Sequence, residues 1–259
     1  MLSITVRVSK IKKGPALKYL PRRRADEKEL ITITLGLLIS TPVLADEHCS
    51  IPDGTISTLQ AKLAIVVSMA DQNGGLFKPN KMWSAVVDRQ GVLCSVIRSD
   101  PDAWPGSRSI AIAKASTAND FSSSQLALST ANLYSFTQPA NNGPALNFPA
   151  GSLYGLNNSN PFNPEFQAQG SGIGKVPGGI ITFGGGVALY SGGQVIGGLG
   201  VSGDTACADH AVAFRMRRLA GLDGTPGGAG SDNIVYLGPA ELPHDVGHPH
   251  CYLTHDIMP

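Results

Sequence analysis

The residues best suited to chemistry follow a strand-like run that ends at a predicted helix start. The apolar stretch Val195–Val201 leads into Ser202, Gly203 and Asp204, and a helix-forming segment begins at once. Ser202 or Asp204 is expected to cap this helix with a side-chain oxygen. Because a helix N-terminus offers unpaired N–H groups and the positive end of the dipole, the junction favours a bound anion such as a ligand carboxylate. The alternative is that this junction is an ordinary connection from a strand to a helix and binds no ligand.

His210 lies six residues after Asp204, in the second turn of the same predicted helix. Imidazole is a good ligand for iron and other transition metals. His210 is therefore a candidate metal ligand in the folded core. The alternative is a histidine that simply hydrogen-bonds to a neighbouring residue.

Two cationic residues, Arg108 and Lys114, lie six positions apart near an earlier helix start. They can bind anionic groups of a ligand. Equally, they can pair with Asp100, Asp102 or Asp120, and surface pairs of that kind contribute little to stability.

The C-terminal tail is rich in potential metal ligands. Its histidines His244, His248 and His250 precede Cys251, and His255 follows. Zinc and copper accept such ligands, although the spacing matches no zinc-finger or metalloprotease motif. The alternative is a polar tail tethered by a disulfide, in which case Cys251 is lost as a ligand.

All four cysteines lie after residue 45, and four cysteines allow three disulfide pairings. The spacing does not choose among them. We expect Cys49–Cys94 and Cys207–Cys251, since each bond would hold a terminal segment against the core. Free buried thiols are the alternative.

Other glycine and serine patterns give no enzyme motif. The clusters Gly184–Gly186 and Gly197–Gly198 lack the Lys-Ser/Thr of a phosphate-binding loop and the spacing of a dinucleotide fold, so close packing is the better interpretation. Ser202 lacks the nucleophile elbow of hydrolases. No catalytic residues are predicted.

Residues 1–45 have the features of a secretory signal peptide: basic clusters, the uncharged run Leu30–Leu44, and a small residue, Ala45, at the expected cut. The alternatives are a buried helix or a short membrane anchor. Of 20 basic and 19 acidic residues, this segment holds 9 and 3, which leaves 11 basic and 16 acidic residues and a net charge of −5. We therefore expect a periplasmic or secreted protein with no affinity for nucleic acid and no membrane insertion once the signal is removed.

The rest of the chain, residues 46–259, is long enough for one domain. Helices are predicted at residues 55–70, 109–120 and 205–220, and a hairpin at residues 82–97 with its turn at 89–91. Further strands are predicted at residues 178–183, 187–190 and 195–201, with a possible edge strand at 233–237. A long loop spans residues 138–175, and residues 221–259 form a C-terminal extension. This order predicts an α/β sandwich whose antiparallel sheet of about five strands is covered by helices.

Three stretches together resemble the GlcG/HbpS-like haem-binding family, also known as DUF336. They are Ala85–Cys94 with its Val-Asp and Gly hairpin, Pro105–Ala118 with a Lys-Ala-x-Thr-Ala motif, and Gly178-Gly-Ile followed by Gly197–Asp204. The long loop, the Cys-Ala-Asp-His segment and the C-terminal extension depart from the simpler family pattern and resemble an exported subgroup.

The resemblance implies a profilin-like α/β sandwich, homo-oligomers, and haem as the suspected cofactor in haem handling or redox sensing. Thr117 falls on the motif threonine that is a candidate haem contact, although threonine is a poor iron ligand. In this picture a tetrapyrrole lies between the helix at 107–120 and the helix start at 202–210. His210 or Thr117 faces iron, Arg108 or Lys114 meets propionates, and Asp204 lies at the same junction. The alternatives are a small-molecule binder or enzyme of unknown reaction with the long loop as a lid, and a structural oligomer whose histidine-rich tail binds metal.

Overall fold

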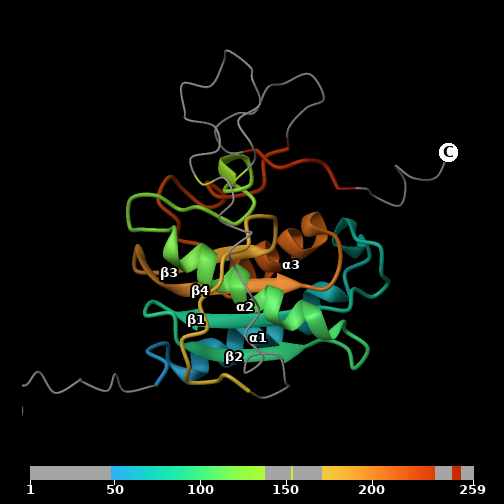
Figure 1. The fold of residues 1–259 in the computed structure, drawn as a ribbon, viewed down its shortest axis with the longest axis horizontal. Coiled ribbons are helices and arrows are strands. Elements are labelled where there is room, and N and C mark those ends of the chain that lie inside the picture. Colours follow the sequence, from blue (N-terminus) through green and yellow to red (C-terminus); the bar gives the residue numbers. More distant parts are fainter. Residues whose placement is uncertain (1–47, 138–152, 154–170, 237–246, 252–259) are drawn as a thin grey trace, which may run out of the picture. The chain divides into compact units, whose positions relative to one another are not determined.

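The computed structural model describes residues 48–137, 153, 171–236 and 247–251, all within one unit of the chain, residues 44–259. Four strands form a single antiparallel sheet in the order β2-β1-β4-β3 (Figure 1). In chain order the elements are α1 (Asp53–Val67), η1 (Gln72–Gly74), β1 (Trp83–Asp88), β2 (Leu93–Arg98), α2 (Pro105–Asp120), η2 (Ser135–Thr137), β3 (Gly186–Ser191), β4 (Gln194–Ser202) and α3 (Ala206–Leu219).

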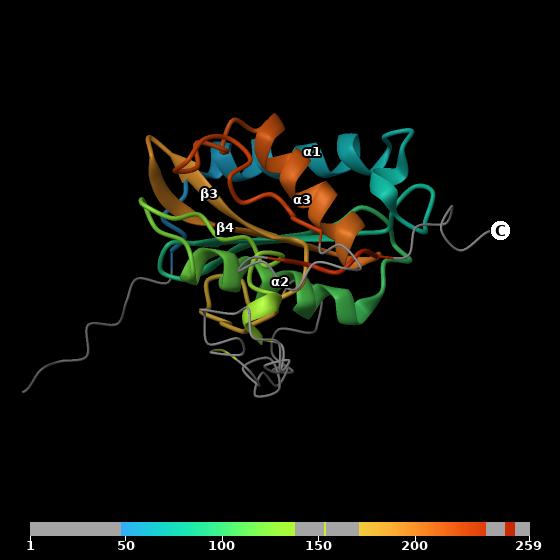
Figure 2. The same ribbon diagram turned by 90° about the horizontal axis from the view of Figure 1, so that it is seen from above.

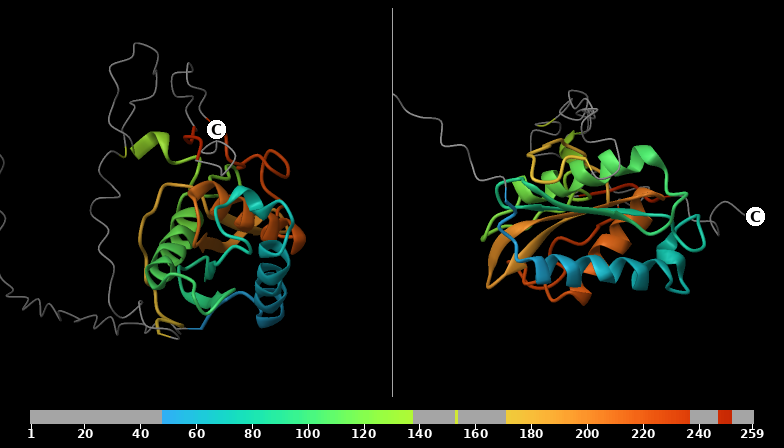
Figure 3. Two further views of the ribbon diagram at one scale, coloured as in Figure 1. Left: turned by 90° about the vertical axis from the view of Figure 1, so that its right-hand side faces the viewer. Right: turned by 90° about the horizontal axis from the view of Figure 1, so that it is seen from below.

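Helices cover both faces of this sheet (Figure 2). α1 and α3 lie side by side over one face, and α2 covers the other (Figure 3). The larger apolar core lies under α1 and α3 and includes Leu59, Leu63, Val86, Leu199 and Met216. A smaller core lies under α2 and includes Trp83, Ala85 and Ile112. The α/β sandwich predicted from the sequence is confirmed.

Glycines in β4 let α2 approach the sheet closely. A Cβ atom on Gly198 would overlap the carbonyl oxygen of Ala115, and one on Gly200 would overlap that of Ala111. Both helix residues are alanines, so small side chains meet glycine on each side of this interface. The glycines therefore serve packing, as the sequence indicated.

We expect Gly200→Ala to lower the free energy of unfolding by about 1–3 kcal/mol, because the added methyl group forces α2 away from β4. Gly106→Ala is the matched control: it lies in the first turn of α2 with open space around its Cβ position. That change should be neutral or slightly stabilising. Urea unfolding of both variants tests the pair, and equal effects would contradict the packing role.

Both expected disulfides are confirmed. Cys49–Cys94 joins the segment before α1 to β2, with Cα atoms 5.2 Å apart, and Cys207–Cys251 joins α3 to the C-terminal segment, with Cα atoms 5.8 Å apart. No helix within the described ranges is long and apolar enough to cross a membrane.

The sheet has one strand fewer than predicted. Residues 178–183 are not a strand: Gly178 and Gly179 have positive φ angles, and the N–H of Ile181 donates to the Thr117 hydroxyl rather than to a neighbouring strand. In the predicted edge segment 233–237, Tyr236 forms only an isolated bridge with His248, and Leu237 lies outside the described residues. The predicted long loop also falls largely outside them.

The prediction of the α3 cap was wrong. Thr205, not Ser202 or Asp204, is the N-cap residue, and its side chain accepts a hydrogen bond from the Ala208 N–H. Asp204 bends away to accept from the N–H groups of Leu76 and Phe77 and from the Asn80 side chain. The Asp204 carboxylate also accepts the Thr205 N–H at 2.7 Å. It therefore fastens the loop after η1 to the start of α3 but does not cap the first turn of the helix.

Candidate functional site

A cavity of about 320 Å³ lies beside α3, between η1 and the segment 233–236. Cys207, His210, Ala211 and Phe214 form one of its walls, and they stand at positions i, i+3, i+4 and i+7 of the helix, which share one face. The other lining residues are Asn73, Gly74, Arg215, Asn233, Ile234 and Tyr236. We call this cavity the His210 pocket.

His210 is fully buried in the wall of this pocket. Its Nε2 lies 3.1 Å from the Ile234 nitrogen and 3.2 Å from Asn233 Oδ1, which also accepts the Ile234 N–H at 2.8 Å. In the tautomer whose Nε2–H donates to Asn233 Oδ1, the lone pair lies on Nδ1, which has no hydrogen-bond partner among the described residues. Burial lowers the pKa of His210 to about 4, despite the nearby carboxylate of Asp232. The imidazole is therefore neutral at physiological pH, which is the form that binds metals.

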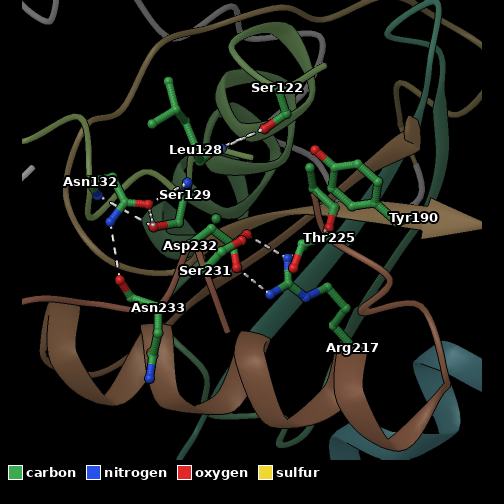
Figure 4. Close-up of polar contacts among 12 residues, drawn as sticks. Ser122, Leu128, Ser129, Asn132, Tyr190, Arg217, Thr225, Ser231, Asp232 and Asn233 are labelled. Carbon is green, nitrogen blue, oxygen red and sulfur yellow. Dashed lines mark hydrogen bonds and ion pairs between the residues drawn. The ribbon is translucent and has the colours of Figure 1, made fainter. Parts of the chain in front are cut away.

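Buried polar contacts hold the wall opposite α3 in place (Figure 4). Both carboxylate oxygens of Asp232 accept from the Arg217 guanidinium at 2.6 Å, and neither side chain is exposed. The next residue, Asn233, accepts from the Asn132 side chain at 3.1 Å through its backbone carbonyl. These contacts fix the segment that reaches Nε2 of His210.

Arg215 forms the charged rim of the pocket. Its guanidinium donates to Asn73 Oδ1 at 2.6 Å and to Asp71 Oδ2 at 2.6 Å. The hydrogen bond from Arg215 lowers the pKa of Asp71. Because about a third of the Arg215 side chain is exposed, it can also meet an anion from solvent.

The first turn of α3 has most of its N–H groups occupied. The Ala208 N–H donates to Thr205, and the Cys207 N–H donates to Cys251 Sγ at 3.0 Å. The segment 247–251 thus covers the helix start where the sequence indicated an anion.

The α2 candidates are buried against protein partners. Lys114 Nζ lies 2.7 Å from Asp209 Oδ2 of α3 and donates to the Val201 carbonyl at 3.1 Å. This pair fills the space between the two helices where a cleft was expected. The expected pairing of Lys114 with Asp100, Asp102 or Asp120 was wrong.

The glycine run before β3 makes this ion pair possible. A Cβ on Gly185 would lie 2.7 Å from Lys114 Nζ and 2.9 Å from Asp209 Cβ. One on Gly184 would overlap the Ala206 carbonyl oxygen of α3. Any larger residue here would separate the two helices.

Thr117 and Arg108 lie along the segment 171–181. The Thr117 hydroxyl donates to the Ala113 carbonyl at 2.7 Å and accepts the Ile181 N–H at 2.9 Å. Arg108 donates to the Ser171 carbonyl at 2.5 Å, but its Nε and Nη1 have no hydrogen-bond partner in the described part of the chain, although the residue is buried.

The tail histidines do not cluster in the described residues. His248 is buried, and its Nε2 accepts the Gly184 N–H at 3.2 Å. His250 is exposed and stacks on Tyr236, with ring centroids 4.4 Å apart. His244 lies outside the described residues.

The family model described as "Haem degrading protein HbpS-like" matches residues 58–217. The chain belongs to the HbpS-like family. This match confirms the resemblance that the three sequence stretches indicated. It spans every strand and most of all three long helices, and it includes Arg108, Lys114, Thr117, Asp204 and His210.

Several solved structures are similar to this HbpS-like chain. Klebsiella pneumoniae protein ORFY is 24% identical with a TM-score of 0.46, over 66% of this chain and 90% of that one. PduOC, solved in complex with haem, is 25% identical with a TM-score of 0.45, over 65% and 94% of the two chains. A double mutant of Streptomyces reticuli HbpS is 20% identical with a TM-score of 0.39, over 64% and 82%. No curated protein matches the chain.

Of the ten residues that line the pocket of this HbpS-like chain, the sequence predicted only His210 as a site residue. Ala211 and Phe214 could have been found from His210 by helical spacing alone. Arg215 and Asn233 could not, since their roles depend on η1 and on the segment after α3 folding back against it.

Proposed function

We propose that the chain is an exported protein that binds haem or a related tetrapyrrole at the His210 pocket. The observation that carries the proposal is His210 itself, a buried and neutral imidazole in a pocket wall, whose Nδ1 has no partner among the residues that the structure describes. Buried polar atoms almost always have a partner, so an orphaned ring nitrogen suggests a ligand. Membership of the HbpS-like family supports the same ligand class.

The lining residues fit an iron tetrapyrrole in part. The neutral imidazole would supply an iron ligand, Arg215 a cation for a propionate, and Phe214 and Tyr236 aromatic surfaces. Bound haem would add redox-active iron. At about 320 Å³ the cavity lies at the lower end of the roughly 300–1,000 Å³ that ligand pockets occupy. It would therefore hold one edge of the macrocycle rather than enclose it.

A second surface for the same ligand is the α2 side, because Nε and Nη1 of buried Arg108 lack partners among the described residues. Lys114 and Thr117 would have to exchange their present partners to take part. Asp204 would likewise have to release the loop that it holds.

Two disulfides support export, since such bonds persist mainly outside the cytoplasm. A role in haem handling or redox sensing would follow from haem binding there. The signal peptide at residues 1–45, the single domain and the homo-oligomer stay predictions.

Titration with hemin, followed by the Soret absorbance of the disulfide-bonded protein, tests this function. We expect saturable binding. His210→Gln should weaken it about tenfold or more, because the loss of an iron ligand should cost more binding free energy than the about 1.4 kcal/mol that a tenfold change represents. His48→Gln is the matched control, an exposed histidine that does not line the pocket.

The outcomes separate the two surfaces. Loss of affinity in Arg108→Met with none in His210→Gln would place the ligand on the α2 side. Absence of any Soret response in the parent protein would overturn the proposed function.

A further inference from the structure

The Cys207–Cys251 disulfide lies beside His248. The two sulfur atoms and a ring nitrogen of His248 all lie within 4.8 Å of one another. Two thiolates and an imidazole are a ligand set that zinc accepts, with a fourth position left for water or another ligand. In the present oxidised form the sulfurs are bonded to each other and cannot bind a metal.

The segment that carries two of these residues is held in place by more than the disulfide. The backbone of Gly247 hydrogen-bonds the Ser135 hydroxyl through both its N–H, at 3.0 Å, and its carbonyl, at 2.7 Å. The His248 N–H donates to the Val235 carbonyl at 2.8 Å. Cleavage of the S–S bond would therefore leave the three ligands near one another.

Each sulfur already accepts a backbone hydrogen bond. The Cys207 N–H donates to Cys251 Sγ at 3.0 Å, and the Cys251 N–H donates to Cys207 Sγ at 3.2 Å. Cys207 Sγ also lies 3.9 Å from the Pro249 carbonyl oxygen, a weaker contact. Donors around a metal ligand orient it and stabilise its negative charge.

The two ring nitrogens of His248 have different hydrogen-bond partners. Its Nδ1 lies 2.7 Å from the Pro249 carbonyl oxygen, which can only accept, so Nδ1 carries the proton. Nε2 then has the lone pair, now held by the long 3.2 Å bond from Gly184. A backbone carbonyl on the other ring nitrogen is a common partner of a metal-ligating histidine.

We propose that reduction of the Cys207–Cys251 bond creates a zinc site made of Cys207, His248 and Cys251. A phosphine reductant converts the disulfide and one water into two thiols, while the phosphine becomes its oxide. Zinc then displaces the two thiol protons, forms two Zn–S bonds and one Zn–N bond, and leaves no net change in redox state. The sulfurs need to separate to about 3.8 Å, as tetrahedral geometry with Zn–S bonds of about 2.3 Å requires.

The second disulfide of the chain is an internal control. Cys49 and Cys94 also have a carboxylate nearby, that of Asp88. However, Asp88 already accepts hydrogen bonds from the N–H groups of Ser50, Gln90 and Val92. The two sulfurs face the carbonyl oxygens of Ile51 and Val92 rather than N–H donors. We therefore expect no zinc site there after reduction.

The test uses the full chain reduced by a water-soluble phosphine without oxygen, and adds Zn²⁺ with a competing chromophoric chelator. Co²⁺ in place of Zn²⁺ reports sulfur ligation through its thiolate charge-transfer absorbance. We expect one zinc per reduced chain and none per oxidised chain. The Cys49→Ala/Cys94→Ala variant should keep the site, and Cys207→Ala/Cys251→Ala should lose it.

His248→Gln decides whether the histidine is a ligand. It should weaken zinc binding by more than about 100-fold, because even outer-shell partners of a metal ligand are worth about 10- to 100-fold. His250→Gln is the matched control and should bind zinc as the parent does.

Other results would overturn the proposal. They are equal zinc binding by the two cysteine variants, no thiolate absorbance with Co²⁺, or an unchanged affinity in His248→Gln. Should a cysteine variant fail to fold, the zinc stoichiometry and the His248→Gln comparison in the reduced parent protein decide alone. Neither readout involves haem, so this site and the His210 pocket stand or fall separately.

Discussion

Replacing Lys114 with methionine is expected to lower the free energy of unfolding by about 3–5 kcal/mol. The change leaves the Asp209 carboxylate buried without its cation, and breaking a buried ion pair by removing one partner has a cost of this order. Methionine nearly matches the volume of the lysine stem, so lost packing contributes little. Chemical denaturation at neutral pH measures the effect.

The pKa shifts of the pair indicate that burial is expensive for both charges. Burial is the largest influence on each group: it raises the pKa of Asp209 to about 6 and lowers that of Lys114, while their mutual attraction opposes both shifts. Without Lys114 the carboxyl pKa rises further. When an acid has a higher pKa in the folded protein than in the unfolded chain, its protonated form stabilises the fold. This contribution is complete below the pKa of the unfolded chain and is lost as the pH rises through the pKa of the folded state. Lys114→Met should therefore regain stability relative to the parent as the pH falls, starting above pH 6, because its Asp209 pKa lies above the parent value of about 6.

A double-mutant cycle with Asp209→Leu completes this test. If the pair is the cause, Lys114→Met/Asp209→Leu should be less destabilised than the sum of the two single variants, because no lone charge stays buried. Additive effects, or a Lys114→Met variant whose deficit does not change with pH, would contradict this account.

The sequence predicted those parts of the fold that depend on local patterns. The apolar spacing of Leu59, Leu63 and Val66 identified α1, and the alternation around Arg89-Gln-Gly identified the β1–β2 hairpin. The prediction of a strand at residues 178–183 failed because Ile180 and Ile181 lie in an apolar run that resembles a strand. In the structure the Thr117 hydroxyl of α2 accepts the Ile181 N–H that a neighbouring strand would need. A contact 64 residues away in the chain is not visible in a window of six residues.

The site was predicted less well because the charged side chains of α2 were interpreted as members of exposed ion pairs. Lys114 and Arg108 are among the most buried side chains of the chain, and the Gly184–Gly186 run that makes room for Lys114 lies 70 residues further on. His210 was identified by its type alone. Its partners Asn233 and Ile234 follow a glycine-rich loop, and the Arg217–Asp232 pair helps to hold them against α3.

Acidification is expected to destabilise the protein through His210. Its pKa is about 6.5 in the unfolded chain and about 4 in the folded state, because burial disfavours the charged ring. A base with a lowered folded-state pKa stabilises the fold above its unfolded pKa, and this contribution is lost as the pH falls from about 6.5 to about 4. A difference of 2.5 pKa units corresponds to about 3 kcal/mol.

The groups around the ring shift the pKa of His210 in both directions, and they do not cancel the lowering by burial. The Asp232 carboxylate and the Asn233 hydrogen bond raise the pKa of His210, whereas Arg217 and His248 lower it. Asp209, on the same helix, titrates in the same pH range with the opposite sign, so the parent protein alone cannot isolate His210. The comparison must be made between the parent and His210→Gln.

Glutamine at position 210 keeps a hydrogen-bonding side chain near Asn233 and Ile234 but cannot gain a proton. We expect urea unfolding at pH values from about 7.5 to about 4.5 to show the stability advantage of the parent over His210→Gln falling by about 2–3 kcal/mol. A constant difference across this range would mean that the imidazole stays accessible to protons in the folded state. The ring would then not be the neutral, buried imidazole that the proposed iron site at the His210 pocket requires.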